Sequence, residues 1–139
     1  MTFDIAAFDT RTKSEVGTDM TILRPGSPFA PFLDAEGKPL TITLKGRNSV
    51  AFKAAQREIQ QRNADREARG IPRTDDDEKT DRFNLLCAVT VGWSFDTLDG
   101  QPFPFSPDNV KKLWADERWA WLQVQAINFH SSEGNFLAA

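Results

Sequence analysis

The sequence has little of the chemistry that enzymes and metalloproteins use. Its 139 residues include one cysteine and one histidine. A single cysteine excludes an intramolecular disulfide and a cysteine-rich zinc site, and it favours a reducing compartment. Gly92 and Gly100 are isolated glycines, so the chain has no phosphate-binding loop and no dinucleotide-binding fingerprint. We therefore expect a protein that is not an enzyme and that carries no metal or cofactor.

Long apolar runs are also absent. No stretch approaches the ~20 residues that a helix needs to cross a bilayer. The first residues, MTFDIAAFDTRTKSE, lack the basic-then-apolar order of a signal peptide. We expect a cytosolic protein with no membrane contact, and the length fits one domain over residues 1–139.

The net charge of −3 is unevenly distributed along the chain. Residues 1–43 carry about −2, residues 44–74 about +5 and residues 75–139 about −6. The basic segment 45–73 suggests a nucleic-acid contact, but Lys53 and Arg57 lie on the helix face opposite Arg62 and Arg69. We therefore favour a solvated helix, or a docking surface for an acidic protein, over a nucleic-acid-binding regulator.

Two strand signals occur in the first third of the chain. Residues 20–23 are apolar and β-branched and are followed by Pro25-Gly26, while residues 40–44 alternate strictly between apolar side chains and threonine. This pattern predicts a small antiparallel sheet over residues 19–46, in which Phe32, close to Pro28 and Pro31, lies in an edge strand or an ordered loop. Residues 1–18 show no sustained period, and we expect them to be partly loose.

Helix signals dominate the rest of the sequence. Asn48 or Ser49 begins a helix that runs to about Arg69 and is supported by the pair Glu58–Arg62. Thr74 begins a second helix with an acidic first turn, and its wide, buried apolar arc runs from Phe83 to Trp93. Residues 106–107, Ser-Pro, begin a third helix, and a fourth runs from residues 116–117 to about 130. The sequence thus predicts an α+β fold. A small N-terminal antiparallel hairpin or meander precedes about four packed helices over 49–131 and a flexible tail over 132–139.

Three features have both a functional and an ordinary interpretation. The acidic run 75–78 resembles a cation site, but four consecutive acids on a helix point in different directions, so a solvated helix start is favoured. His130 has no second histidine or activated nucleophile near it in the sequence, which favours a structural or surface role. Cys87 falls in a wide apolar arc, where we expect it to be an inert small hydrophobe.

The four tryptophans divide by helical phase. We expect Trp93, Trp114 and Trp119 to lie in the core. Trp121 is turned about 160° away from Trp119 on a helix, and it shares its side with Val124 and Ile127. A single core covers only one of two opposed apolar stripes, so we predict that Trp121, Val124 and Ile127 contact a partner.

Two blocks of sequence look familiar together. One is residues 39–59, PLTITLKGRNSVAFKAAQREI. The other combines Gly92-Trp93, residues 99–102 (DGQP), residues 104–109 (PFSPDN), Trp119 and the final residues 135–137 (NFL). In this order they resemble the tail assembly chaperones of long-tailed phages and prophages, over about two-thirds of the chain.

This resemblance implies a non-enzymatic protein of the host cytoplasm. Such a protein binds the tape measure protein and tail tube proteins during tail assembly, and it is often made together with a frameshifted, C-terminally extended form. The resemblance adds Phe136 and Leu137 to the candidate contact residues. The alternatives are a structural minor tail or connector protein of the particle and, less favoured, a nucleic-acid-binding regulator. Self-association into a homo-oligomer fits the same apolar surface.

Overall fold

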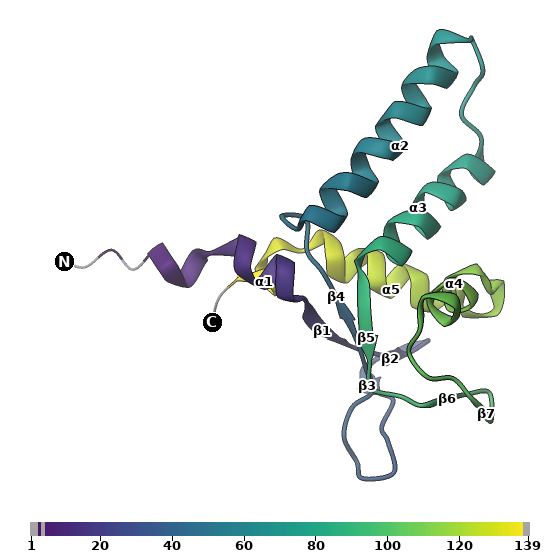
Figure 1. Ribbon diagram of the computed structural model, residues 1–139. Helices are drawn as coiled ribbons and strands as arrows, with labels where there is room; N and C mark the ends of the chain where they lie inside the picture. Colours follow the sequence, from purple (N-terminus) through teal and green to yellow (C-terminus); the bar gives the residue numbers. More distant parts are fainter. Residues whose placement is uncertain (1–2, 4, 138–139) are drawn as a thin grey trace.

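The chain is an α+β protein in which small antiparallel sheets combine with helices (Figure 1). The computed structural model describes residues 3 and 5–137. The α-helices are α1 (Thr10–Val16), α2 (Val50–Ala68), α3 (Asp75–Val89), α4 (Pro107–Ala115) and α5 (Ala120–Ser131). Three 3₁₀ turns are η1 (Ile5–Phe8), η2 (Glu117–Trp119) and η3 (Glu133–Phe136). The strands are β1 (Thr18–Thr21), β2 (Leu23–Arg24), β3 (Ser27–Pro31), β4 (Thr41–Leu44), β5 (Thr90–Trp93), β6 (Thr97–Leu98) and β7 (Gln101–Pro102).

The main sheet has β4 at its centre, antiparallel to both β1 and β5. Ile42 and Leu44 on β4 are fully buried, whereas the intervening Thr41 and Thr43 are partly exposed. Met20 on β1 lies opposite Ile42 and is also buried. The strand predicted from the alternation of residues 40–44 is confirmed. β2–β3 and β6–β7 form two further, two-stranded sheets.

Side-chain caps fix where the main helices begin. Ser49 accepts the Phe52 N–H at the start of α2, and Ser106 accepts the Asn109 N–H at the start of α4. Thr74 and Asp77 form a reciprocal capping box at the start of α3, where the acidic run supplies the first turn. The predicted starts of these helices are confirmed.

The core lies where the sheet meets the bases of the helices. Its buried side chains come from every layer of the fold: Met20, Ile22, Ile42, Leu44, Phe52, Leu86, Val89, Val110, Leu113, Trp114, Leu122 and Ala126. The Trp114 indole N–H donates to the Thr90 hydroxyl at 3.1 Å, so its one polar atom is paired inside the core. The core assignment of Trp114 is confirmed. Trp93 is half-buried between stacked Phe95 and Phe103, with ring centroids 5.0 and 5.4 Å away.

The fold differs from the prediction after Val89. The sequence pattern suggests a helix that continues to Trp93, but α3 ends at Val89 and residues 90–93 form β5. The Thr90 hydroxyl donates to the Leu86 carbonyl at 2.6 Å, which satisfies a carbonyl of the last helical turn. Thr90, Gly92 and Trp93 pair with β4, so tertiary pairing replaces the expected helix.

The described residues near each end of the chain are more ordered than the sequence suggests. α1 occupies residues 10–16 of the segment expected to be loose, and Asp9 caps it. In the segment 132–137, expected to be part of a flexible tail, η3 packs against α1 and α5. Phe136 is 2% exposed. These are corrections to the expectation for residues 5–18 and 132–137; residues 1–2, 4 and 138–139 lie outside the described part of the chain.

The α2–α3 hairpin projects away from the sheets (Figure 1). Few apolar side chains hold it together, and Phe52 at its base is the one buried residue of α2. Near the tip, Asp81 is buried and bonds to Arg62 and Arg73, and Arg66 pairs with Asp77. The sequence suggested support from pairs within α2, such as Glu58–Arg62; the structure places Arg62 against α3 instead. None of the described helices combines the length and apolar character needed to cross a membrane.

Candidate functional site

α5 has a buried strip and an exposed strip on opposite sides. Leu122 and Ala126 point into the core, together with His130 one turn further on. Ala120 and Val124 point to solvent, and Val124 is 59% exposed. An exposed valine beside an exposed alanine leaves an apolar strip uncovered, and two hollows flank it. These two hollows are the candidate partner sites of the molecule.

The first hollow, called the groove below, lies between α3, the α4–η2 connection and α5. It is an open depression of about 690 Å³. Its lining residues are Lys79, Thr80, Arg82, Phe83, Trp114, Ala115, Asp116, Glu117, Trp119, Ala120, Gln123 and Val124. The mixture of apolar and charged side chains in an open depression suits a segment of another chain better than a small substrate.

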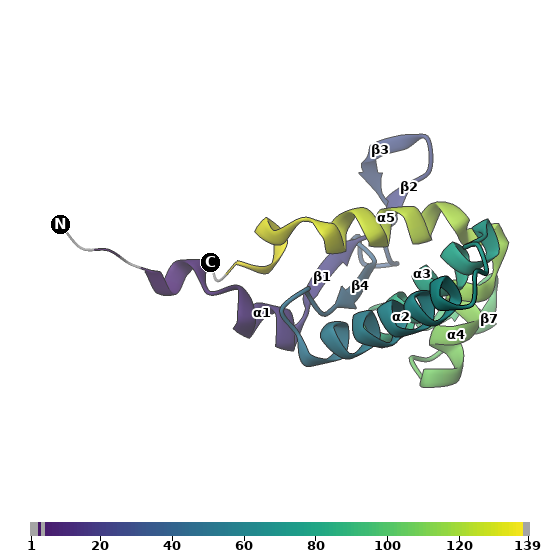
Figure 2. The same ribbon diagram turned by 90° about the horizontal axis from the view of Figure 1, so that it is seen from above.

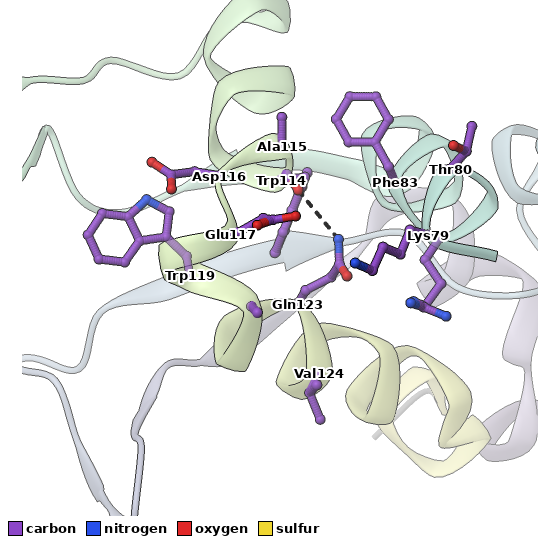
Figure 3. A pocket seen from close by; sticks show the side chains of 12 residues that line it. Lys79, Thr80, Phe83, Trp114, Ala115, Asp116, Glu117, Trp119, Gln123 and Val124 are labelled. Carbon is purple, nitrogen blue, oxygen red and sulfur yellow. Dashed lines mark hydrogen bonds between the residues drawn. The ribbon is translucent and has the colours of Figure 1, made fainter. Parts of the chain in front are cut away.

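Figure 3 shows how the groove is built. Phe83 and Lys79 of α3 lie across from Glu117 and Gln123, while Trp119 points to the opposite side of the η2 backbone. The Gln123 side-chain amide donates to the Trp114 carbonyl at 3.4 Å, which ties the start of α5 to the end of α4. The walls of the groove therefore come from three elements that the core holds in place.

The groove has charge of opposite sign on its two sides. Lys79 and Arg82 lie on α3, and Asp116 and Glu117 lie on the α4–η2 side. Hydrogen bonds from Arg118 hold the pKa of the Asp116 carboxyl below its usual range. Asp116 is therefore ionised at neutral pH, and it forms an ion pair with Arg118 at 2.7 Å. Walls of opposite charge favour one direction for a polar segment that binds between them.

The second hollow, called the pocket below, lies on the other flank of α5. It has a volume of about 260 Å³. It is lined by Ile22, Phe32, Leu40, Phe95, Thr97, Leu98, Asp99, Leu113, Trp119, Trp121 and Leu122. Aromatic and aliphatic side chains dominate this lining, so the pocket fits an apolar side chain.

The structure separates the five residues predicted to contact a partner. Val124 is exposed and lines the groove. Trp121 is half-buried and stacks on Phe32 with ring centroids 5.8 Å apart, so it lines the pocket instead. Ile127 is half-buried against the core. The three side chains expected to form one face therefore lie on different sides of α5.

Phe136 is corrected from a contact residue to a core residue. Its ring packs edge-on against Phe129 at 5.8 Å and lies 6.1 Å from His130. At 2% exposure it has no surface to offer a partner, and Leu137 beside it is half-buried. The buried ring fills the space between α1 and α5. The motif formed by residues 135–137 does not by itself indicate this burial.

Sequence reasoning missed several residues of the two hollows. The sequence pattern predicts that Phe83 belongs to the buried arc of α3, but in the structure Phe83 is half-buried and faces the groove. The sequence pattern predicts an edge strand or loop at Phe32 but does not indicate that its side chain forms a wall of the pocket. One signal was available: the width of the apolar arc on α3 exceeds what one core contact covers. The contacts of Phe32 come from segments that are distant in the sequence, so no local pattern indicates its place in the pocket.

The described residues hold no group of three or more histidine, cysteine, aspartate or glutamate side chains arranged for a metal ion. Burial raises the pKa of the Cys87 thiol to about 11, so the side chain is a neutral thiol at physiological pH. The geometry at Cys87 thus gives it the character of a small apolar residue.

His130 is buried, at 3% exposure, and packs on Phe52 with ring centroids 4.9 Å apart. Its Nδ1 lies 3.0 Å from the Lys45 carbonyl oxygen. Because a carbonyl only accepts, Nδ1 carries the proton and donates, which leaves Nε2 as an acceptor. Nε2 is buried and has no hydrogen-bond partner within the described chain. His130 therefore links α5 to the end of β4 as a neutral side chain.

Acidification is expected to destabilise the fold through His130. Burial lowers the pKa of His130, and the charge of Arg47 lowers it further against the opposing Lys45 hydrogen bond. The unfolded chain then binds a proton below pH about 6.5 while the folded chain does not, so stability falls as pH decreases through that value. The decrease is at most about 1.4 kcal/mol per pH unit. Urea unfolding at pH 7.5, 6.5 and 5.5 measures it.

The matched variant for this measurement is His130→Asn, whose amide can still donate to the Lys45 carbonyl. The chain has no other histidine, so the variant is expected to lose the pH dependence between 7.5 and about 5.5. Equal pH dependence in the wild type and the variant would show that His130 does not govern acid sensitivity.

Comparisons of the chain with protein-family models, with curated proteins and with solved structures each return no match. The resemblance to tail assembly chaperones therefore stays a prediction.

Proposed function

We propose that the protein is a phage tail assembly chaperone. It binds the tape measure protein and tail tube proteins during tail assembly by docking a helical segment of the client in the groove. The observation that carries this proposal is the groove itself: an open depression with an apolar strip, Ala120 and Val124, between walls of opposite charge.

The residues that carry the family resemblance have structural roles in this chain, as a binding protein requires. Asp99 and Gly100 have φ of 53° and 75°, the two left-handed positions of the tight turn between β6 and β7. Ser106 caps α4, and Gly92 lies opposite Thr43 in the main sheet. Residues 39–59 supply β4 and the first half of α2. These residues thus build the frame that positions the groove.

The groove suits an amphipathic helix. Such a helix buries an apolar stripe against Phe83, Ala120 and Val124 and leaves its polar flanks against Lys79 and Glu117. Release of the client after assembly requires a moderate affinity. Because the walls of the groove carry charged side chains, the contact between groove and client is not fully apolar, which suits such an affinity. The arrangement supports reversible docking.

Co-expression with the tape measure protein and the tail tube proteins tests the proposal. We expect the tape measure protein to co-purify with the chain, and we expect mass spectrometry of purified particles to find no copy of the chain. Detection of the chain in mature particles at a stoichiometry comparable with known tail proteins would favour a structural minor tail or connector protein. Failure of both client classes to co-purify would count against the chaperone assignment.

A further inference from the structure

A short apolar arm lies outside the fold at the start of the described chain. Phe3, Ile5 and Phe8 are 81%, 65% and 64% exposed, and η1 contains no buried residue. Figures 1 and 2 both show this segment extending away from the body beyond α1. Three large apolar side chains exposed within six residues form a patch that water disfavours, and such patches mark contact sites.

The arm extends away from the pocket of its own chain (Figure 1), because α1 is anchored to the segment after β4. The Gly46 N–H donates to the Ser14 carbonyl at 2.9 Å, and Ser14 is 1% exposed. The Asn48 amide also bonds to the Thr10 hydroxyl. Figure 1 shows α1 at the end of the molecule away from β6, and Thr97 and Leu98 of β6 form one side of the pocket. As placed by these anchors, the arm points toward other molecules and not toward its own pocket (Figures 1 and 2).

The pocket has the size and chemistry for the arm. A cavity of about 150 Å³ holds one benzene molecule, so the pocket, at about 260 Å³, has room for one to two phenyl rings. Phe32, Trp119 and Trp121 offer aromatic walls for edge or stacked contacts with such rings.

The charged residues beside the arm and beside the pocket are of opposite sign. In the sequence, Asp4 and Asp9 stand beside the arm's phenylalanines, and no lysine or arginine precedes Arg11. Arg24 is exposed and lies over the Phe32 ring, with its guanidinium carbon 5.1 Å from the ring centroid. It forms no ion pair with any residue of the described chain. The acid of the pocket lining, Asp99, is paired with Arg118 at 3.4 Å.

We propose that the arm of one copy of this chain, whose described residues are 3 and 5–8, docks in the pocket of a second copy. Because the two surfaces differ, the contact is head-to-tail, and repeating it extends to a ring or a filament. The pocket shares Trp119 with the groove lining, but Val124 lines the groove and not the pocket, so a chain within such an assembly still presents Val124 to a client. The inference does not depend on the proposed function, and its test uses the purified chain alone.

Two variants separate the arm from the pocket. Phe3→Ser combined with Phe8→Ser removes the arm's rings. Thr97→Asp adds an acid at an exposed position of the pocket lining, where it repels the acidic arm. Ile71→Ser is the control, because Ile71 is 51% exposed but lies in the loop between α2 and α3. Sedimentation velocity measures the mass of each protein over a range of concentrations.

The wild type and Ile71→Ser are expected to increase in mean mass with concentration above the monomer mass of 15.6 kDa. The arm variant and the pocket variant each stay monomeric alone. Mixed in equal amounts they form a species of twice the monomer mass and nothing larger, because one supplies the pocket and the other the arm. This complementation also shows that both variants are folded. A wild type that stays monomeric, self-association of either variant, or a mixture that stays monomeric would overturn the proposal.

Discussion

Asp81→Ala is expected to lower the free energy of unfolding by about 2–3 kcal/mol and to open the α2–α3 hairpin from its tip. Asp81 is 5% exposed and accepts hydrogen bonds from Arg62 at 3.2 Å and Arg73 at 2.8 Å. Removal of one member of a buried ion pair costs about 3–5 kcal/mol because the remaining charge is left unpaired. The two arginine side chains are 40% and 46% exposed here, so water recovers part of that loss.

The hairpin depends on Asp81 because little else joins its helices near the tip. The α2 surface that faces α3 carries Ala55, Glu58 and Arg62, which offer little apolar area. Without the carboxylate, Arg62 and Arg73 keep their charges but lose their shared partner, and the buried Arg62 Nε already lacks a partner in the described structure. The base is held separately by Phe52, Leu86 and Val89 in the core. The damage should therefore concentrate in residues 60–80.

Hydrogen exchange and denaturant unfolding together measure this effect. We expect faster exchange for amides near the tip, with amides of β4 much less affected. Asp65→Ala is the matched control, because Asp65 is exposed on the same hairpin and forms no ion pair in the described chain. Equal exchange rates in Asp81→Ala and Asp65→Ala would show that the ion pairs of Asp81 do not hold the tip of the hairpin together.

Gly46→Ala is expected to cost a similar amount, near the upper end of the range of about 1–3 kcal/mol for overpacking a core. A methyl group at this position would lie 2.8 Å from Cδ1 of Phe136 and would also overlap the Ser14 hydroxyl. Phe136 and Ser14 are 2% and 1% exposed, so neither has free space to move into. The substitution should push η3 away from α1 and expose the Phe136 ring.

Gly134→Ala provides the control for this prediction. Gly134 lies in η3 itself, and a methyl group there would meet no atom within 4 Å. Its stability should stay within about 0.5 kcal/mol of the wild type, as for an ordinary surface substitution. Urea unfolding compares the two alanine variants. If Gly46→Ala is as stable as Gly134→Ala, the close packing of β4's end against Phe136 does not contribute as we describe.

The elements with local signals could be predicted from the sequence. Ser49, Thr74 and Ser106 mark helix starts through their own side chains, and the alternation of residues 40–44 marks a strand with one buried face. Each signal acts over a few residues, so no knowledge of distant segments was needed.

The elements that depend on distant contacts could not be predicted. β5 forms because residues 90–93 pair with β4, almost fifty positions earlier in the chain. Phe136 is buried because α1 and Gly46 close around it. Helical phase placed Trp121 away from Trp119 but could not show that Phe32 would cover it. The same limit applies to the candidate site: helical phase predicts that Val124 is exposed, but it does not predict that Phe83 faces the groove.

The affinity of the chain for the tape measure protein tests the central claim most directly, with Val124→Lys compared with Val16→Lys. Val124 is 59% exposed in the groove, whereas Val16 is 71% exposed on α1, outside the groove lining, so both substitutions leave the fold intact. Docking a helix on Val124→Lys would bury the introduced ammonium group among apolar side chains, and we expect at least about a tenfold loss of affinity, or about 1.4 kcal/mol. Val16→Lys should bind like the wild type. Unchanged affinity of Val124→Lys would contradict docking in the groove.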